Sequence, residues 1–198
     1  MAKLINKVGY GQVEPNRILA RKNGGVVADV PVSPDYVKET QRVENGYFLS
    51  WEVGAGFEGN LKKGQLVAPT AESTVVGLVY TETKLYSEYT SNKDFALFTQ
   101  NPTIHQIRQS NIYDKDEKAH ETVVPRILLA TAGDVFTTNI IETETGELPA
   151  VGAELTLNAD GALSTAGTVG VIKAKVAQIT TMPDGQPAVK VVITSVGV

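Results

Sequence analysis

Short apolar runs, separated by turn residues, recur along most of the chain. The runs are rich in valine, isoleucine, threonine and aromatic residues, whereas glycine, proline, asparagine and aspartate gather between them. They cover residues 47–53, 65–68, 74–80, 94–98, 122–130, 134–141, 154–157, 168–177 and 188–196. Short strands with frequent turn signals predict a mainly β fold, namely a small β-barrel or sandwich.

Residues 1–43 differ, because glycine or proline interrupts every candidate element. The apolar stretches 18–20 and 26–28 flank Asn23-Gly24, a pair that favours a tight hairpin turn. Residues 35–43 predict a short helix. A segment this interrupted buries little surface alone, so it must lie on its own body or on a neighbour. We expect an extended N-terminal arm and favour one that wraps a neighbour.

The rest of the chain divides into two β-rich parts and a polar connector. Residues 44–98 are predicted to form a first β module and residues 132–198 a second. Residues 99–131 are predicted to connect them, as an exposed excursion whose charge run DKDEKAH is typical of a solvated loop or helix face. Alternatively, residues 44–198 form one composite β domain.

The two β-rich parts can be aligned, which indicates an internal repeat. Gly46, Gly64 and Gly77 of the first part correspond to Gly133, Gly152 and Gly170 of the second. The alignment also matches the Asp184-Gly185 turn with a polar turn predicted at residues 91–93. Two related β modules would follow from a duplication, although glycine–valine patterns also recur by coincidence in β proteins.

Charge and composition narrow the classes of function. The formal net charge is −4, whereas nucleic-acid-binding proteins usually carry a basic face, so we expect no nucleic-acid partner. The chain has no cysteine, which excludes disulfides, thiolate nucleophiles and cysteine-based metal sites. The first residues lack the apolar core of a signal peptide, and no run reaches the roughly 18 apolar residues of a membrane helix. We therefore expect no membrane partner.

No motif in the sequence predicts catalysis. His105 and His120 lie in the polar connector without a recognised ligand spacing, so surface histidines are expected. Residues 54–59 fit GxGxxG, but another turn follows instead of the helix N-terminus that holds phosphate. Residues 158–161 faintly resemble a calcium loop and fit an Asp-Gly hairpin better. A catalytic pair of carboxylates stays an alternative, since Asp and Glu residues occur throughout the sequence. We predict no catalytic residues, no metal site, no cofactor and no enzymatic activity.

Three segments resemble structural proteins of tailed bacteriophages: VVPRILLATAGDVFTTNII, GAELTLNADGALSTAG and TTMPDGQPAVKVVIT. The likeness is to capsid decoration (cement) or head-fibre-type proteins of phages of Gram-positive hosts. It lies in the pairing of "PR…GD.FTTN" with "LT…ADG.LS" and a terminal "MPDGQP..K" hairpin. It covers residues 122–195 and, less closely, 46–98, whereas residues 1–43 and 99–121 match no such motif.

The resemblance implies a β-barrel or sandwich, often trimeric, that binds the outer surface of a capsid and reinforces its lattice. The expected partners are then the phage major capsid protein and further copies of this chain, as a homotrimer. The expected location is the virion, after synthesis in the host cytoplasm. Because a terminal arm often makes the capsid contact in such proteins, we select its apolar and basic residues as candidate contacts: Arg17, Ile18, Leu19 and Arg21.

A second class of function is a receptor- or glycan-binding component of a head fibre or tail. Tyr86, Tyr89 and the excursion at residues 99–121 would carry it, because glycan-binding surfaces use exposed aromatic side chains. Tyr80 lies close to these two tyrosines in the sequence. Packing within strands is the alternative explanation for all three.

Overall fold

The computed structural model describes residues 2–6, 11–30, 32–33, 36, 42–52, 64–80, 85–87, 90–93, 96–98 and 125–197. Strands dominate, and the prediction of a mainly β fold is confirmed. The described elements are β1 (Lys3–Leu4), β2 (Val13–Arg17), α1 (Ala20–Asn23), β3 (Val26–Val27), β4 (Arg42–Glu44), β5 (Phe48–Glu52), β6 (Gln65–Val67), β7 (Val76–Val79), β8 (Leu85–Ser87), β9 (Thr90–Lys93), β10 (Ala96–Phe98), β11 (Ile127–Leu129), β12 (Val135–Thr138), β13 (Ile141–Thr143), β14 (Glu154–Leu157), β15 (Leu163–Ser164), β16 (Val169–Thr181) and β17 (Pro187–Val196).

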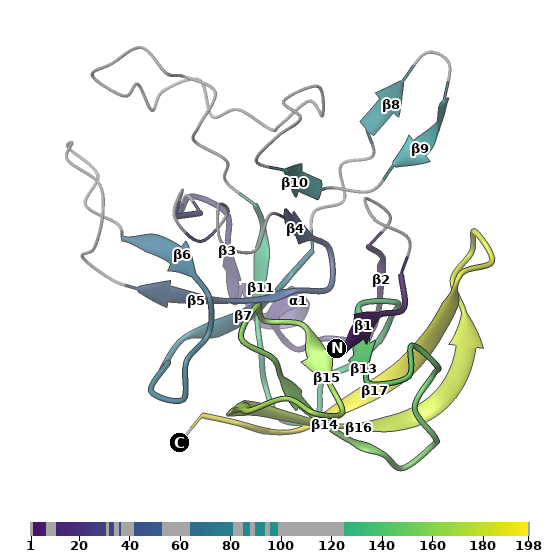
Figure 1. The fold of residues 1–198 in the computed structure, drawn as a ribbon. Helices are drawn as coiled ribbons and strands as arrows, with labels where there is room; N and C mark the ends of the chain where they lie inside the picture. Colours follow the sequence, from purple (N-terminus) through teal and green to yellow (C-terminus); the bar gives the residue numbers. More distant parts are fainter. Residues whose placement is uncertain are drawn as a thin grey trace.

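An eight-stranded sheet forms the larger layer, in the order β1-β13-β15-β14-β16-β17-β12-β2. It curls into a half-barrel, whose curvature is clearest along β16 and β17 in Figure 1. Neighbouring strands are antiparallel, except that β13 and β15 run parallel. The long β16–β17 hairpin extends past the other strands at one side of the sheet (Figure 1).

A five-stranded sheet, in the order β3-β11-β7-β5-β6, forms the second layer. Successive side chains of a strand point to opposite faces. Phe48 of β5 therefore packs in the core facing the larger sheet, while Leu49 packs in a second core on the other face. Leu78 and Val79 of β7 divide in the same way. Both faces of this sheet are buried, which explains its nearly continuous apolar runs. Two further pairs, β4–β10 and β8–β9, are two-stranded.

The first core lies between the two sheets and joins them. Phe48 of the smaller sheet and Phe136 of the larger are both fully buried, with ring centroids 6.1 Å apart and planes tilted by 58°. Around them pack side chains from both layers, including Leu78, Leu128, Leu155, Leu157, Val189 and Val191. The described parts of residues 44–98 and 132–198 thus share one core.

The second core covers the outer face of the five-stranded sheet. Residues that precede β4 contribute much of it: Val30, Val32 and Tyr36 are buried there with Leu49 and Leu66. Val32 also forms a parallel bridge with Leu66 of the edge strand β6. This stretch of chain therefore closes the face that the larger sheet leaves open.

The described part of residues 1–43 is built into this body. β2 forms an edge of the larger sheet beside β12, where Pro15 is tolerated because edge strands can spare a backbone donor. β1 pairs with β13, and β3 pairs with β11. The expectation of an arm that wraps a neighbour is therefore corrected for these residues. Several of their apolar side chains, among them Val13, Ile18 and Val27, are buried on the same chain, while Leu19 and Val26 are exposed.

Asn23-Gly24 ends a helical turn and does not form a hairpin. α1 occupies Ala20–Asn23, and Gly24 follows it in the left-handed conformation at φ +77°. Glycine is favoured after a helix C-terminus for this reason, and the sequence pattern of a glycine cap overlaps that of a hairpin turn.

Two further local predictions differ from the structure. The helix predicted over residues 35–43 ends too late, because Arg42 and Val43 belong to β4; apart from Tyr36, its remaining residues lie outside the described part. The turn predicted at residues 91–93 is strand β9, which pairs with β8. A polar Ser-Asn-Lys sequence fits either a turn or an exposed strand, so strand pairing decides between them.

Strand pairing does not follow the predicted repeat. β5 pairs with both β6 and β7, whereas β12, the counterpart of β5, pairs with β17 and β2. The likeness is confined to turns: the matched glycines at 46 and 133, and at 64 and 152, all have positive φ. The predicted connector also ends earlier than residue 131, because β11 lies inside the five-stranded sheet. Residues 99–124 lie outside the described part.

The two Asp-Gly stretches form the same turn, as predicted. In the β16–β17 hairpin, Met182 donates its N–H to the Gln186 carbonyl at 2.8 Å, and Gly185 adopts φ +84°. In the β14–β15 hairpin, Asn158 donates to the Ala162 carbonyl at 2.9 Å, and Gly161 adopts φ +82°. A three-residue loop that ends in a left-handed glycine is a common hairpin connection.

Candidate functional site

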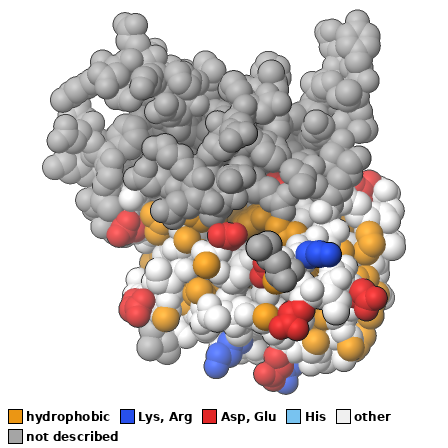
Figure 2. All heavy atoms as spheres, in the orientation of Figure 1, with side chains coloured by type: hydrophobic (Ala, Val, Ile, Leu, Met, Phe, Trp, Pro, Cys, Tyr) orange, Lys and Arg blue, Asp and Glu red, His pale blue; other side chains and the backbone are white. Residues whose placement is uncertain are grey.

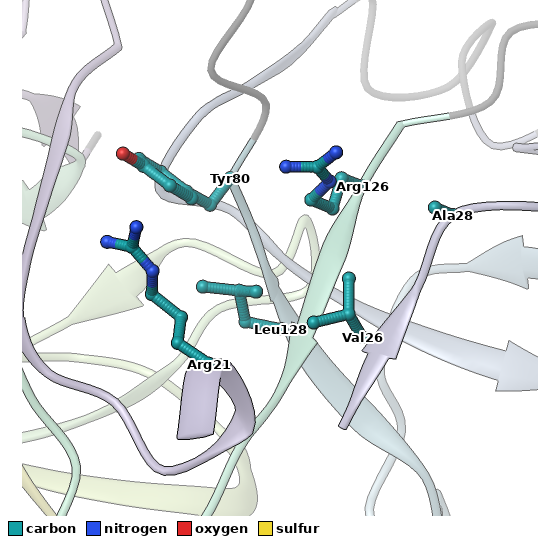
Figure 3. Close-up of a pocket in the computed structure, with 6 residues that line it drawn as sticks. All are labelled: Arg21, Val26, Ala28, Tyr80, Arg126 and Leu128. Carbon is teal, nitrogen blue, oxygen red and sulfur yellow. The ribbon is translucent and has the colours of Figure 1, made fainter. Parts of the chain in front are cut away.

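A pocket of about 360 Å³ lies where α1, β3 and β11 meet. Figure 3 shows that both arginine side chains and the tyrosine ring stand around it, over an aliphatic floor. The described residues that line it are Arg21, Val26, Ala28, Tyr80, Arg126 and Leu128.

Backbone pairing fixes most of these side chains. Leu128 of β11 lies opposite Val26 of β3 on one side and Leu78 of β7 on the other. Tyr80 follows β7 directly and donates its N–H to the Arg126 carbonyl at 2.9 Å. The tyrosine and Arg126 are thereby held beside each other at the ends of neighbouring antiparallel strands.

Arg21 reaches the pocket from α1. Its guanidinium carbon lies 5.7 Å from the centroid of the Tyr80 ring, within the range of a cation–π interaction. Such a contact stabilises by about 0.5–1 kcal/mol at an exposed site. Tyr80 therefore orients Arg21 at one wall of the pocket.

The chemistry of the lining favours an anion that carries an apolar group. The described lining residues include two guanidinium groups and no carboxylate, in a chain whose formal net charge is −4. A guanidinium offers a planar fork of N–H donors that matches carboxylate or phosphate oxygens. The floor is aliphatic, because it is formed by the side chains of Leu128, which is buried, and Val26, which is 36% exposed.

The four predicted contact residues lie in different environments in the fold. Ile18 is only 5% exposed and packs in the first core, so it cannot contact a partner, and its selection is corrected. Arg17 and Leu19 are exposed, the latter at 43%. Arg21 is exposed and lines the pocket. An apolar residue in an interrupted segment suggests an interface, but here Ile18 belongs to the chain's own core.

The Asn158–Gly161 loop is a packed structural turn. Asn158 accepts hydrogen bonds from Asp160 and Ala162 through Oδ1, at 3.0 and 2.9 Å. Gly161 accepts from the N–H of Phe48 at 2.8 Å, which ties the loop to β5. Tyr36 donates its phenol to the Asp160 carbonyl at 2.6 Å, and burial raises the pKa of that phenol well above its usual value. These bonds hold the loop against β5 and Tyr36.

Several sequence candidates lie outside the described residues. They are His105, His120, residues 54–59, Tyr89 and the excursion at 99–121, while Tyr86 lies in β8 with its side chain undescribed. Within the described ranges, no three His, Asp or Glu side chains gather as a metal site would require. Nor does any helix in those ranges have the length and apolar character needed to cross a membrane.

Sequence reasoning singled out Arg21 and Tyr80 but missed Arg126 and Val26. A signal was present in VVPRILLA, where Arg126 is the one charge within an apolar strand-like run. A charged residue at the start of a buried strand stands where the chain meets solvent. Its proximity to Arg21 depends on the pairing of β11 with β3, which the local pattern does not reveal.

The chain was compared with protein-family models, with curated proteins and with solved structures, and none of the three comparisons gave a match.

Figure 2 shows how charge is distributed over one face of the molecule. The acidic side chains of its described part are scattered singly among hydrophobic and uncharged ones. This distribution differs from the pocket, where two cations converge on one hollow.

Proposed function

We propose that the chain is a non-enzymatic structural protein of a bacteriophage virion. It binds the outer surface of the capsid, through the major capsid protein, and stabilises the lattice. The motifs that resemble decoration and head-fibre-type proteins suggest this class. A homotrimeric assembly belongs to the same proposal, since proteins of that kind are often trimeric.

One observation carries the protein-binding part of this proposal. Leu19, Arg21 and Val26 come from one short stretch of chain and are exposed, and Arg21 and Val26 line the same pocket as Tyr80 and Arg126. Arginine and tyrosine are enriched in protein–protein interfaces and among the residues that dominate binding energy. We call the set Leu19, Arg21, Val26, Tyr80 and Arg126 the α1–β3 surface.

A rigid support lies beneath this surface. Ile18 precedes Leu19 and is buried in the first core, and Leu128 at the floor of the pocket belongs to the same core. A preformed surface loses little conformational entropy when it binds. Many copies on a lattice would then each contribute a modest interface, and a trimer would multiply the strength of attachment.

Sedimentation with capsids tests the proposal. Capsids assembled without this protein are mixed with increasing amounts of the purified full chain and then pelleted. We expect saturable binding and a higher melting temperature for the decorated capsids. Sedimentation equilibrium of the free protein should give three times the mass of one chain. Absence of binding across the full concentration series would overturn the proposed function.

A further inference from the structure

We propose that the outer edge of β16 at residues 177–181 pairs with the same edge of a second copy of this chain. The two strands run antiparallel about a two-fold axis and continue the larger sheet from one copy into the next. We call this segment, on the side away from β17, the open edge. The contact involves only this chain, so it does not rest on binding to a capsid.

The neighbouring strand β14 covers β16 only as far as Val176. Gly152, just before β14, donates its N–H to the Val176 carbonyl at 2.7 Å, and Val176 donates to the Ala153 carbonyl at 3.0 Å. β16 continues beyond this point to Thr181. Within the described ranges, no strand pairs with residues 177–181 on the side away from β17. The hairpin that projects in Figure 1 therefore has one covered and one open edge.

The open edge presents the backbone groups of Ile179 and Thr181. Met182 donates its N–H across the turn to the Gln186 carbonyl at 2.8 Å, so its backbone faces the β17 side. Because the N–H and C=O groups of successive residues in a strand alternate between its two sides, those of Thr181 and Ile179 point away from β17. Pro187, which has no N–H, lies opposite Thr181 and agrees with this direction.

The open edge also lacks the features that usually prevent pairing between chains. Edge strands are commonly protected by charge, by proline, by short length or by a covering segment. β2 contains Glu14 and Pro15, β1 and β3 span two residues each, and Val32 bridges to β6. Residues 177–181 carry neither charge nor proline, and Ile179 is exposed. Such an edge is suited to the addition of a strand from another chain.

The spacing of the two outward residues favours a second copy as the added strand. When Ile179 pairs with Thr181 of the second copy, Thr181 pairs with Ile179 of that copy, and the two-fold axis passes between the two Thr180 residues. Each pair exchanges both of its N–H and C=O bonds, so every outward group of these residues gains a partner. The two Ile179 side chains become diagonal neighbours on one face of the joined sheet.

The exposed apolar side chains near the open edge fit this register. Ile179 lies opposite Val189, which is buried in the first core, so the 46% exposed Ile179 stands at the margin of that core face. Val151 is 62% exposed in the turn before β14, beside the bond between Gly152 and Val176. The tip of the second hairpin would reach this turn, so pairing covers both apolar side chains.

The rest of the sheet holds the hairpin from the opposite side. Gln12, just before β2, donates its side-chain amide to the Asp184 carboxylate at the tip, at 2.8 Å. Preorganisation of this kind lowers the entropy lost on binding. The contact is nevertheless much shorter than a standard interface of roughly 800 Å² per partner, so it is weak between free molecules. A two-fold contact joins two copies, and on a lattice it would link neighbouring trimers.

Disulfide cross-linking tests the contact and its register. The chain has no cysteine, so one introduced cysteine reports one contact. Thr180→Cys places two thiols across the axis in a non-hydrogen-bonded pair, whose Cα atoms lie about 4.5 Å apart, within the range of a disulfide. Gln178→Cys is the matched control on the same face of the same strand, because its counterpart in the second copy is displaced by about 13 Å along the strand.

The full chain carrying either substitution is mildly oxidised over a series of protein concentrations and run on a denaturing gel without reductant. We expect Thr180→Cys to give about tenfold more covalent dimer than Gln178→Cys, because distant cysteines cannot be bridged. In the Thr180→Cys background, Ile179→Lys puts a charge on the open edge and should lower the dimer yield about fivefold or more. Ile179→Val keeps an apolar β-branched residue and should leave the yield within about twofold. Circular dichroism during heating checks that every variant folds.

The possible outcomes separate this contact from the proposed function. Equal dimer yields from Thr180→Cys and Gln178→Cys would overturn the proposed pairing, and so would a yield that Ile179→Lys leaves unchanged. No dimer from Thr180→Cys at the highest concentration would also overturn it and would leave the open edge to a strand of another protein. If the dimer forms as expected but the protein does not bind capsids, the proposed function is wrong and the two-fold contact stands.

Discussion

Leu19 donates its main-chain N–H to the carboxylate of Asp134 at 2.8 Å, across 115 residues of sequence. The other oxygen of the same carboxylate accepts the N–H of Thr131 at 2.9 Å. Asp134 is buried and its own carbonyl accepts from Ile193 of β17. One side chain thus fastens the start of α1 to the larger sheet.

Asp134→Ala should therefore destabilise the fold. It leaves two main-chain donors without their acceptor, and each unsatisfied buried donor costs about 1–3 kcal/mol. We expect a loss of about 2–4 kcal/mol in the free energy of unfolding, measured with urea, and a smaller loss for Asp134→Asn, which keeps one acceptor oxygen. Glu154→Ala removes only an exposed ion pair with Lys175 and should change stability by less than about 1 kcal/mol. Equal effects of the two alanine variants would contradict the anchoring role.

Substitutions at two adjacent residues distinguish a role in folding from a role in binding the partner protein. Ile18 packs in the first core, whereas Leu19 is 43% exposed. Ile18→Ala should reduce the free energy of unfolding by about 2–5 kcal/mol, and Leu19→Ala by less than about 1 kcal/mol. In capsid sedimentation, only Leu19→Ala should weaken binding while the protein stays fully folded. If Leu19→Ala binds like wild type, Leu19 does not belong to the interface.

Gly161 and Gly185 provide a matched pair in the two identical turns. Both have positive φ, but a Cβ on Gly161 would clash with the Phe48 carbonyl oxygen, whereas a Cβ on Gly185 would meet nothing within 4 Å. Gly185→Ala should cost about 1–2 kcal/mol for the left-handed backbone alone. Gly161→Ala should cost more than about 4 kcal/mol or prevent a cooperative transition, as seen by circular dichroism during heating. Similar melting temperatures for the two variants would contradict this packing.

The Phe48–Phe136 contact predicts that the two sheets unfold together. A double-mutant cycle with leucine at each position should give a coupling energy of about 0.5–1.5 kcal/mol, typical of aromatic pairs. Tryptophan fluorescence, which reports on Trp51 of the smaller sheet, and far-ultraviolet circular dichroism should give coincident urea transitions. Two separate transitions would instead show that the sheets are independent domains.

Tyr36 predicts a loss of stability at high pH. Burial raises the pKa of its phenol well above the usual 10.0, and Tyr47 and Asp160 act in the same direction. The folded protein then binds this proton more tightly than the unfolded chain, so its contribution is complete below pH 10 and declines as the pH rises above 10.

Urea unfolding at a series of pH values measures this decline. Tyr36→Phe should be less stable than wild type by about 1 kcal/mol at neutral pH, because the bond to the Asp160 carbonyl is lost. Above pH 10 its stability should fall less steeply than that of wild type. An unchanged slope in Tyr36→Phe would assign the alkaline loss to other groups.

Local sequence patterns were sufficient for about half of the strands and for both Asp-Gly turns. β14 matches its predicted range, and β5, β6, β7 and β17 differ by one or two residues at their ends. These elements depend on neighbouring residues: β-branched side chains favour strands, and a glycine supplies the left-handed position of a turn. The Asp184-Gly185 turn can therefore be predicted from the neighbouring residues alone.

Long-range pairing explains what the sequence did not reveal. The interrupted stretch at residues 1–43 carries no local sign that β2 lies beside β12, or that Asp134 accepts the N–H of Leu19. The pocket depends on the same kind of information, because Arg21 and Arg126 line one pocket only once β3 pairs with β11. The sequence indicated arginine and tyrosine residues as candidates for binding. The pairing of distant strands determines which of them line the same pocket.

The edge position of β2 has a mechanical consequence. Arg21 lies just after β2 in the chain, so a partner that pulls on the α1–β3 surface pulls along that strand. Hydrogen bonds between antiparallel strands run perpendicular to the strand direction. Tension along β2 therefore loads its bonds to β12 in shear and all at once, with the Asp134 carboxylate as a further tether. If the α1–β3 surface is the contact proposed above, a load applied along β2 is therefore carried by all of these bonds together.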